Sequence, residues 1–166
     1  AAILFAYGKI VPLDWLNIPL HGFINIHASL LPKWRGSAPV QRAIENNDKM
    51  TGISIMKMND KIDEGPILAQ QDIKINNTTN GKQLIDQISY DSCSLLFNTL
   101  KKYFLGQVPL KEQDHSQSTY AKKINKAETQ VDWGLSANVI EKKIRAFYPS
   151  PAMWFIHKGH RYKILK

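Results

Sequence analysis

An amide, an imidazole and a carboxylate in the first 65 residues could act together on a carbonyl group. Asn25 and His27 fall at alternate positions of the apolar stretch at residues 23–27, and Asp63 stands in the turn IDEG at residues 62–65. Alternate residues of a strand project from the same face, so an extended stretch would present the amide and the imidazole together. An amide can stabilise a developing oxyanion, and an imidazole paired with a carboxylate can move a proton.

These residue types suit direct transfer of an acyl group to an amine, without a protein nucleophile. They do not require it, because a histidine at a strand end is more often structural and an Asp before a Gly is ordinary in a turn. Ser29 lies near His27 but lacks the surroundings of a nucleophile elbow. His27 and Asp63 are only two ligands, and no HxH or HExxH spacing occurs, so we expect no metal.

Alternating and continuous apolar stretches predict the strands that must position these side chains. We expect strands at residues 3–7, 23–27, 51–58 and 66–75. Helical spacing and capping residues predict helices at residues 12–16, 37–44 and 80–104, with Gly106 closing the last. This mixture predicts an α/β fold in which the long helix packs on a sheet.

The C-terminal part has a different organisation. Residues 107–125 are polar and lack clear periodicity, which is typical of a linker. A helix is predicted from Ser136 to about Phe147, followed by strands at residues 152–157 and 160–165 around a tight turn. A lone hairpin is marginal in water, so we expect the chain to stop just inside a second, β-rich domain and to be part of a longer protein.

Composition argues against membrane insertion and disulfide bonding. The chain has 166 residues, of which 43% are hydrophobic, and no stretch approaches the ~20 apolar residues of a membrane helix. The first residues lack the basic region of a signal peptide. The single cysteine, Cys93, can form no internal disulfide and fits a reducing compartment. We therefore expect a cytoplasmic protein, bacterial or in an organellar matrix, with no membrane partner.

Positive charge gathers in the C-terminal part. Residues 1–121 carry 12 Lys and Arg against 11 acids, whereas residues 122–166 carry 10 against 3. Such asymmetry indicates contact with a polyanion, nucleic acid first, although a merely solvated basic surface is an equal alternative. The side chains that could contact phosphates are Lys122, Lys123, Lys126, Arg161, Lys163 and Lys166.

Seven segments carry a family resemblance in a fixed order: AYGKIVP, NIHASLLPKWRGSAPVQRAI, TGISIMKM, KIDEGPIL, STYAKKI, VDW and IRAFYPSP. With them the chain resembles the folate-dependent formyltransferases, and within that family the methionyl-tRNA formyltransferases. HASLLPKWRG is the most specific segment, and the segments from STYAKKI onward favour the tRNA enzymes over the shorter glycinamide ribonucleotide formyltransferases. The resemblance spans essentially the whole chain.

The resemblance implies an architecture and an activity. Residues 1–106 would form the C-terminal half of a Rossmann-like formyltransferase sheet domain, residues 107–125 a linker, and residues 126–166 the start of an OB-like barrel that helps to hold tRNA. The enzyme would transfer the formyl group of 10-formyltetrahydrofolate to the amino group of methionyl-initiator tRNA, for translation initiation. Its partners would be this folate and this tRNA, and we expect a monomer.

The resemblance also implies roles for single residues. Asn25 would bind the oxyanion, His27 would polarise the formyl carbonyl or take the amine proton, and Asp63 would orient His27 and a relay water. The folate site would comprise Ile10, Val11, Ser29, Leu30, Leu31 and Pro32. The acceptor end of the tRNA would contact Lys33, Trp34, Arg35 and Arg42. For Trp34, packing under the loop is an equal alternative.

Other functions stay open beside this one. The same folate donor could serve an amino sugar nucleotide as acceptor, although IRAFYPSP and the basic C-terminal part favour tRNA. The chain could also be a non-catalytic, basic RNA-binding fragment whose Asn25, His27 and Asp63 are structural. Because the N-terminal strands of the family and most of its barrel are missing, we expect these 166 residues alone to be inactive.

Overall fold

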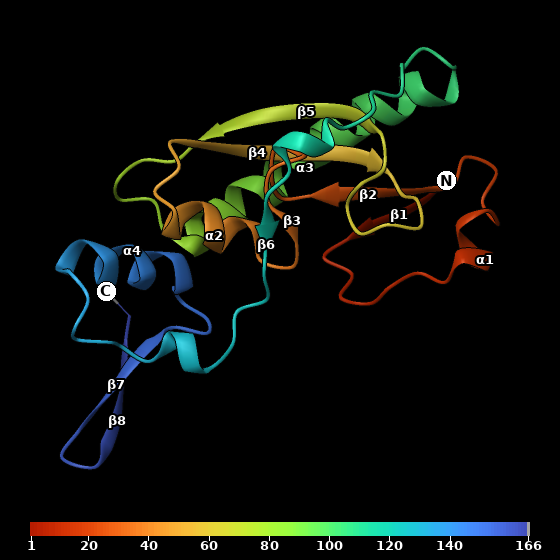
Figure 1. The fold of residues 1–166 in the computed structure, drawn as a ribbon. Helices are drawn as coiled ribbons and strands as arrows, with labels where there is room; N and C mark the ends of the chain where they lie inside the picture. Colours follow the sequence, from red (N-terminus) through yellow and green to blue (C-terminus); the bar gives the residue numbers. More distant parts are fainter. Residues whose placement is uncertain (166) are drawn as a thin grey trace.

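A four-stranded mixed sheet forms the centre of the computed structural model, which describes residues 1–165 (Figure 1). In pairing order its strands are β1 (Ala2–Phe5), β2 (Phe23–His27), β4 (Met50–Lys57) and β5 (Ile67–Lys74). β1 and β2 run parallel, whereas β2–β4 and β4–β5 are antiparallel. The predicted α/β class is confirmed. Lys166, one of the predicted phosphate contacts, lies outside the described residues.

Helices α2 (Pro39–Glu45) and α3 (Gly81–Phe104) pack against this sheet, and the short α1 (Leu13–Leu16) lies in the connection between β1 and β2. β4 buries residues 51–56 without interruption, as expected of a strand covered on both faces. The core joins strand and helix residues that are almost inaccessible to solvent: Ile24, Ile44, Ile53, Ile55, Leu84 and Ile88. Burial of each such side chain stabilises the fold by roughly 1.5–3 kcal/mol.

The long helix α3 begins where its capping residues predict. The Asn80 side chain accepts the backbone N–H of Gln83 at 2.9 Å, and the Gln83 side chain accepts that of Asn80 at 3.0 Å. This reciprocal capping box satisfies two backbone donors of the first turn. Gly81 follows, and a Cβ there would lie 2.6 Å from the Ala146 carbonyl oxygen. The glycine thus allows α3 to start directly against the end of α4 (Ala137–Phe147).

The segment predicted as a linker packs on the core. Lys111 and Ile67 exchange both backbone hydrogen bonds, at 2.8 and 3.0 Å, beside the edge strand β5. Farther along, β6 (Tyr120–Ala121) pairs in parallel with β3 (Arg35–Gly36), and the short helix η1 (His115–Gln117) lies between these contacts. Residues 107–125 therefore connect two structured regions while contacting the first along much of their length.

The C-terminal residues form a helix and a hairpin, as the pattern predicted. After η2 (Ala127–Thr129) comes α4, which packs against α2, and then β7 (Met153–His157) pairs antiparallel with β8 (His160–Ile164). Figure 1 shows this hairpin extending away from the four-stranded sheet. Phe155 stacks on Tyr162 with ring centroids 5.5 Å apart, and the Trp133 ring meets Phe155 edge-on at 5.7 Å. This aromatic cluster anchors the hairpin to the chain that precedes α4.

Two further observations concern the chain as a whole. Among residues 1–165, none of the helices combines the length and apolar character needed to cross a bilayer. Cys93 is a free thiol on the exposed side of α3.

Candidate active site

Strand β2 places Asn25 and His27 on one face of the sheet. Ile24 and Ile26, which alternate with them, point into the core and are 0% and 8% exposed. Hydrogen-bonded neighbours, β1 and β4, hold both edges of β2. The two polar side chains therefore project from a rigid strand near its carboxyl end, as the alternation predicted.

The loop that joins β4 to β5 brings Asp63 to these two side chains. Asp63 Oδ1 lies 3.5 Å from Asn25 Nδ2, and Asp63 Oδ2 lies 3.6 Å from His27 Nδ1. The backbone N–H of Gly36 donates to the same Oδ2 at 2.8 Å. The fold thus assembles the three predicted residues into one cluster, here called the Asn–His–Asp cluster. Contacts of 3.5–3.6 Å are loose, as is common at catalytic groups before they close on a substrate.

The two ring nitrogens of His27 face different oxygen atoms. Nε2 lies 2.9 Å from the carbonyl oxygen of Trp34, and Nδ1 faces the Asp63 carboxylate. Because a carbonyl oxygen only accepts, Nε2 carries the hydrogen in this contact. Nδ1 is then the atom at which a proton can pass between the ring and Asp63. The ring is almost fully buried, so these contacts fix its orientation.

The segment predicted to contact folate, residues 29–32, folds back on the sheet. Ser29 is fully buried, and its hydroxyl donates to a carbonyl of the same loop at 2.6 Å. The Leu31 N–H donates to Ser54 Oγ at 3.0 Å, and the Ser54 hydroxyl donates to the Ser29 carbonyl at 2.7 Å. These bonds hold the loop on β4. Leu30 and Pro32, in contrast, line a surface hollow.

The other two residues predicted for the folate site follow strand β1. Ile10 is 80% exposed, and Val11 is buried. Because β1 and β2 are parallel, with Phe5 opposite Ile26, their carboxyl ends meet at the same edge of the sheet. The connection that holds Ile10 and Val11 therefore leaves the sheet at the edge where His27 lies, which is where α/β folds commonly bind ligands.

The loop after His27 contains an exposed lysine and a half-buried tryptophan. Lys33 is exposed, whereas the indole N–H of Trp34 donates to Asp48 Oδ2 at 2.7 Å. Trp34 also contacts the main hydrophobic core and has a positive φ of 61°. In this conformation the tryptophan packs against the body of the protein, and Lys33 is the more accessible of the two.

Arg35 and Arg42, predicted to contact the acceptor end of tRNA, are engaged with carboxylates of the chain. Arg35 is 1% exposed and pairs with Glu64 at 3.1 Å. Arg42 donates to both carboxylate oxygens of Glu128, at 2.9 and 3.0 Å, and to Glu45 at 2.7 Å. The hydrogen bond with Glu128 raises the pKa of Arg42 against the opposing effect of burial. Each guanidinium charge is thus balanced inside the protein.

Residues 111–121 contribute to the site and were missed by sequence reasoning. Gln113 is buried, and its side-chain amide donates to the carbonyl oxygens of Asp63 and Gly65. The carbonyl of Thr119 accepts the N–H of Arg35 at 2.9 Å. The STYAKKI motif at residues 118–124 was the available indication, because it carries family resemblance inside an otherwise unpatterned polar stretch.

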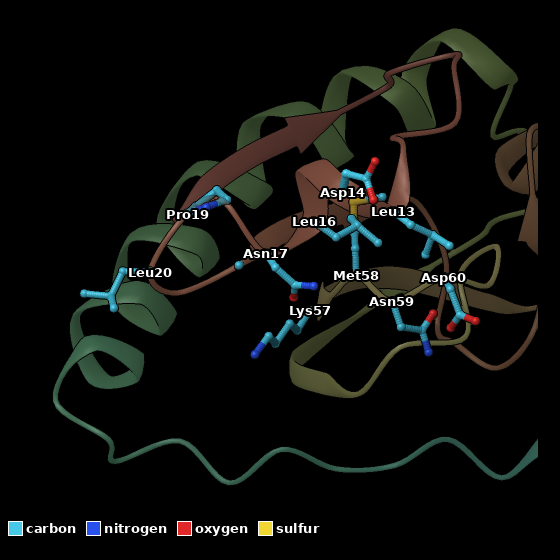
Figure 2. A pocket seen from close by; sticks show the side chains of 11 residues that line it. Leu13, Asp14, Leu16, Asn17, Pro19, Leu20, Lys57, Met58, Asn59 and Asp60 are labelled. Carbon is cyan, nitrogen blue, oxygen red and sulfur yellow. The ribbon is translucent and has the colours of Figure 1, made fainter.

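Two of the hollows on the surface of residues 1–165 are lined by residues outside the Asn–His–Asp cluster. The larger has a volume of about 460 Å³ and lies between α1, the residues after it and the end of β4 (Figure 2). Figure 2 shows Lys57, Asn59 and Asp60 on one side of it and Leu16 and Asn17 on the other. The smaller, of about 320 Å³, lies beside the loop after His27. Within residues 1–165, no group of three or more His, Cys, Asp or Glu side chains could hold a metal ion.

Two sequence models of known protein families match the chain. The sequence model of the formyl transferase family matches residues 1–100, and that of the formyl transferase C-terminal domain matches residues 123–166. The chain belongs to the formyl transferase family, as its motifs predicted.

Two curated relatives of the chain are named methionyl-tRNA formyltransferase. A methionyl-tRNA formyltransferase from Pelagibacter ubique is 46% identical over 164 residues, covering 99% of this chain and 53% of the relative. One from Corynebacterium jeikeium is 42% identical over 164 residues, covering 99% of this chain and 50% of the relative. The chain therefore spans about half the length of the curated relatives it matches.

Solved structures share the fold at low sequence identity. HypX from Aquifex aeolicus in complex with tetrahydrofolic acid superposes with a TM-score of 0.85 at 14% identity, covering 99% of this chain and 28% of that one. A 4-N formyltransferase from Francisella tularensis has a TM-score of 0.85 at 20% identity, covering 99% of this chain and 69% of that one. The arrangement of β1, β2, β4 and β5 with α3 is thus a formyltransferase fold.

Proposed function

We propose that this chain carries the catalytic centre of a methionyl-tRNA formyltransferase. The reaction transfers the formyl group of 10-formyltetrahydrofolate to the amino group of methionyl-initiator tRNA. The observation that carries the proposal is the Asn–His–Asp cluster, assembled from β2 and the β4–β5 loop in a chain 42–46% identical to proteins of that name. Because the cluster offers an oxyanion donor and a proton carrier without a nucleophile, it suits direct attack by a substrate amine.

Each member of the cluster has a defined task in this proposal. The amine nitrogen forms a bond to the formyl carbon, and the carbonyl oxygen becomes an oxyanion that accepts a hydrogen bond from Asn25 Nδ2. The bond between the formyl carbon and N10 of the folate then breaks. The amine loses a proton and N10 gains one, and the proton passes through the pair of His27 Nδ1 and the Asp63 carboxylate, because Nε2 is bonded to the Trp34 carbonyl oxygen. Asp63, 3.6 Å from His27 Nδ1, orients the ring.

The substrates would approach from different parts of the chain. We place the folate beside Ile10, Val11 and the loop at residues 29–32, near the carboxyl ends of β1 and β2. Lys33 is exposed on that loop and could contact a phosphate of the acceptor end. We further propose a catalytic domain at residues 1–106, a connection at 107–125 and the first part of an OB-like, tRNA-binding domain at 126–166.

An amino sugar nucleotide is the second candidate acceptor. A solved N-formyltransferase from Helicobacter canadensis, in complex with folinic acid and dTDP-3-aminofucose, shares the fold with a TM-score of 0.71 at 21% identity. The match covers 82% of this chain and 51% of the Helicobacter canadensis chain. The higher identity to the tRNA enzymes and the basic residues 122–166 favour tRNA.

The decisive experiment measures formyl transfer by the full-length protein to methionyl-tRNA and, separately, to an amino sugar nucleotide. Formyl-methionyl-tRNA from the wild type, with a loss of about 100-fold or more in His27→Ala, supports the proposal. His21→Ala is the matched control, because His21 packs on Phe104 with ring centroids 4.8 Å apart, away from the cluster. Formylation of the sugar nucleotide alone would replace the proposal by the second candidate.

A further inference from the structure

A buried glutamine joins the two loops that carry the candidate active site. Gln113, which is 5% exposed, donates through Nε2 to the carbonyl oxygens of Asp63 at 2.9 Å and Gly65 at 2.8 Å. Its Oε1 accepts from Arg35 Nε at 3.1 Å and Arg35 Nη2 at 2.8 Å. Both donors and both lone pairs of the amide are therefore used.

Arg35 extends this hydrogen-bond network to the side chain of Glu64, in the turn at residues 63–65 whose backbone Gln113 contacts. Its Nη1 pairs with Glu64 Oε1 at 3.1 Å, and its Nη2 lies 3.2 Å from His115 Nδ1. The turn is thus held twice, by Gln113 on its backbone and by Arg35 on the side chain of Glu64. A buried cation requires such neutralisation and full hydrogen bonding.

The position of the Asp63 carboxylate depends on the two loops that Gln113 connects. Oδ2 of Asp63 accepts the N–H of Gly36, the residue after Arg35, and the same oxygen faces His27. Asp63 also has a positive φ of 54°, which is uncommon for a residue other than glycine and persists only where surrounding contacts hold it. The bond from Gln113 to the Asp63 carbonyl is such a contact.

We propose that Gln113 is a positioning residue: it holds the turn at residues 63–65 against Arg35 and Gly36, and so keeps the Asp63 carboxylate beside His27. The inference rests on the proposed formyl transfer, in which His27 and Asp63 handle the proton. Gln113 acts through Asp63 and reaches it from a segment 50 residues farther along the chain.

Two substitutions in the full-length protein separate the bonds of Gln113. Gln113→Met keeps the length of the side chain and removes all four hydrogen bonds. Gln113→Glu keeps an acceptor for Arg35 but turns an oxygen, instead of an N–H group, toward the carbonyls of Asp63 and Gly65. Gln87→Met is the matched control, because Gln87 is exposed on α3 and lies outside both loops that carry the candidate active site.

The expected result is a loss in kcat with little change in KM. We expect kcat to fall about 100-fold in Gln113→Met and Gln113→Glu, with KM for both substrates within about twofold of wild type, because a displaced carboxylate impairs the reaction rather than substrate binding. Gln87→Met should match the wild type. A folded Gln113→Glu with wild-type kcat, or with an effect confined to KM, would overturn the proposal. If Gln113→Met does not fold, Gln113→Glu decides alone.

A readout that does not need activity keeps the two proposals distinguishable. The Gly36 amide proton, bonded to the Asp63 carboxylate at 2.8 Å, should give a downfield NMR resonance in the wild type and in Gln87→Met. Loss of the Gly36 resonance in the Gln113 variants supports the positioning role, whether or not the wild type forms formyl-methionyl-tRNA. Absence of that product from the wild type would overturn the proposed function instead. An unchanged Gly36 resonance in both folded Gln113 variants contradicts the positioning role.

Discussion

The Asp63 carboxylate is fixed by a backbone group, the N–H of Gly36, which donates to its Oδ2 at 2.8 Å. Gly36 can serve this role because it has a φ of 107° and lies against β6, where a Cβ would come within 2.9 Å of the Ala121 carbonyl oxygen. The bond therefore couples the carboxylate of the cluster to the pairing of β3 with β6. Four predictions concern this coupling, the Asn–His–Asp cluster, an ion pair of α2 and the basic C-terminal hairpin.

Gly36→Ala should lower the stability of the fold. The new Cβ meets a backbone oxygen that cannot move aside cheaply, at a φ that side chains rarely adopt, so we expect a loss of about 1–3 kcal/mol in the free energy of unfolding. Gly159→Ala is the matched control, since Gly159 also has a positive φ of 79° but nothing within 4 Å of its Cβ position. Chemical denaturation of both variants measures the difference, and equal losses would contradict the steric argument.

Asp63→Asn should reduce formyl transfer while preserving the fold. The amide keeps the size of the side chain and can still accept the Gly36 N–H, but it loses the charge that faces His27 Nδ1. We expect kcat to fall by about 10²–10⁴-fold, the usual contribution of general acid–base groups. Asp60→Asn, an exposed residue of the same loop, should retain wild-type kcat in the same assay. Wild-type kcat in Asp63→Asn would remove Asp63 from the mechanism.

Glu128→Gln should remove a pH-dependent part of the stability. The hydrogen bond from Arg42, opposed by burial and aided by the backbone N–H of Asn125, lowers the pKa of Glu128 in the folded protein. A depressed folded pKa adds stability above the unfolded value of about 4.3, and this contribution is lost as the pH falls through the folded pKa.

The free energy of unfolding should therefore be about 1 kcal/mol lower in Glu128→Gln than in the wild type at pH 7, with a smaller difference below pH 4. Urea titrations at several pH values measure this convergence. Glu112→Gln, at an exposed position, is the control and should follow the wild type at every pH. A difference for Glu128→Gln that is constant with pH would show that the carboxylate charge is irrelevant.

Lys163→Gln should weaken tRNA binding in a salt-dependent way. Lys163 is exposed on β8, opposite Trp154 of β7, whose ring lies under the Arg161 guanidinium at 4.1 Å. Loss of one phosphate contact should lower the slope of log Kd against log salt concentration by about 0.7–0.9. Lys101→Gln on α3 serves as the control, and binding titrations over a range of salt concentrations measure both slopes. An unchanged slope for Lys163→Gln would exclude this phosphate contact.

Much of the fold could be predicted because its elements carry local patterns. The alternation of β2 marked Asn25 and His27 as neighbours on one face, and the structure places them so. The start of α3 followed from Asn80 and Gln83, whose side chains cap each other's backbone. Such features depend on residues close in sequence, and the chain encodes them directly.

Other parts of the site could not be predicted, because they depend on contacts between distant residues. β3 and β6 are two residues each and have no period to detect. Gln113 stands in a polar stretch, and its burial requires partners from two other loops. The family resemblance implies contacts of Arg35 and Arg42 with the acceptor end of tRNA, whereas their pairing with Glu64 and Glu128 depends on residues distant in sequence.

The pairing of β3 with β6 also determines when, during synthesis on the ribosome, the loop after His27 can be held in place. The Trp34 N–H donates to the hydroxyl of Thr119, a residue 85 positions later. At ribosomal rates of 5–20 residues per second, those partners are made roughly 4–17 seconds after the loop they hold. The loop after His27 therefore leaves the ribosome before its partners exist, and its contacts with residues 113–121 can form only once those residues have emerged.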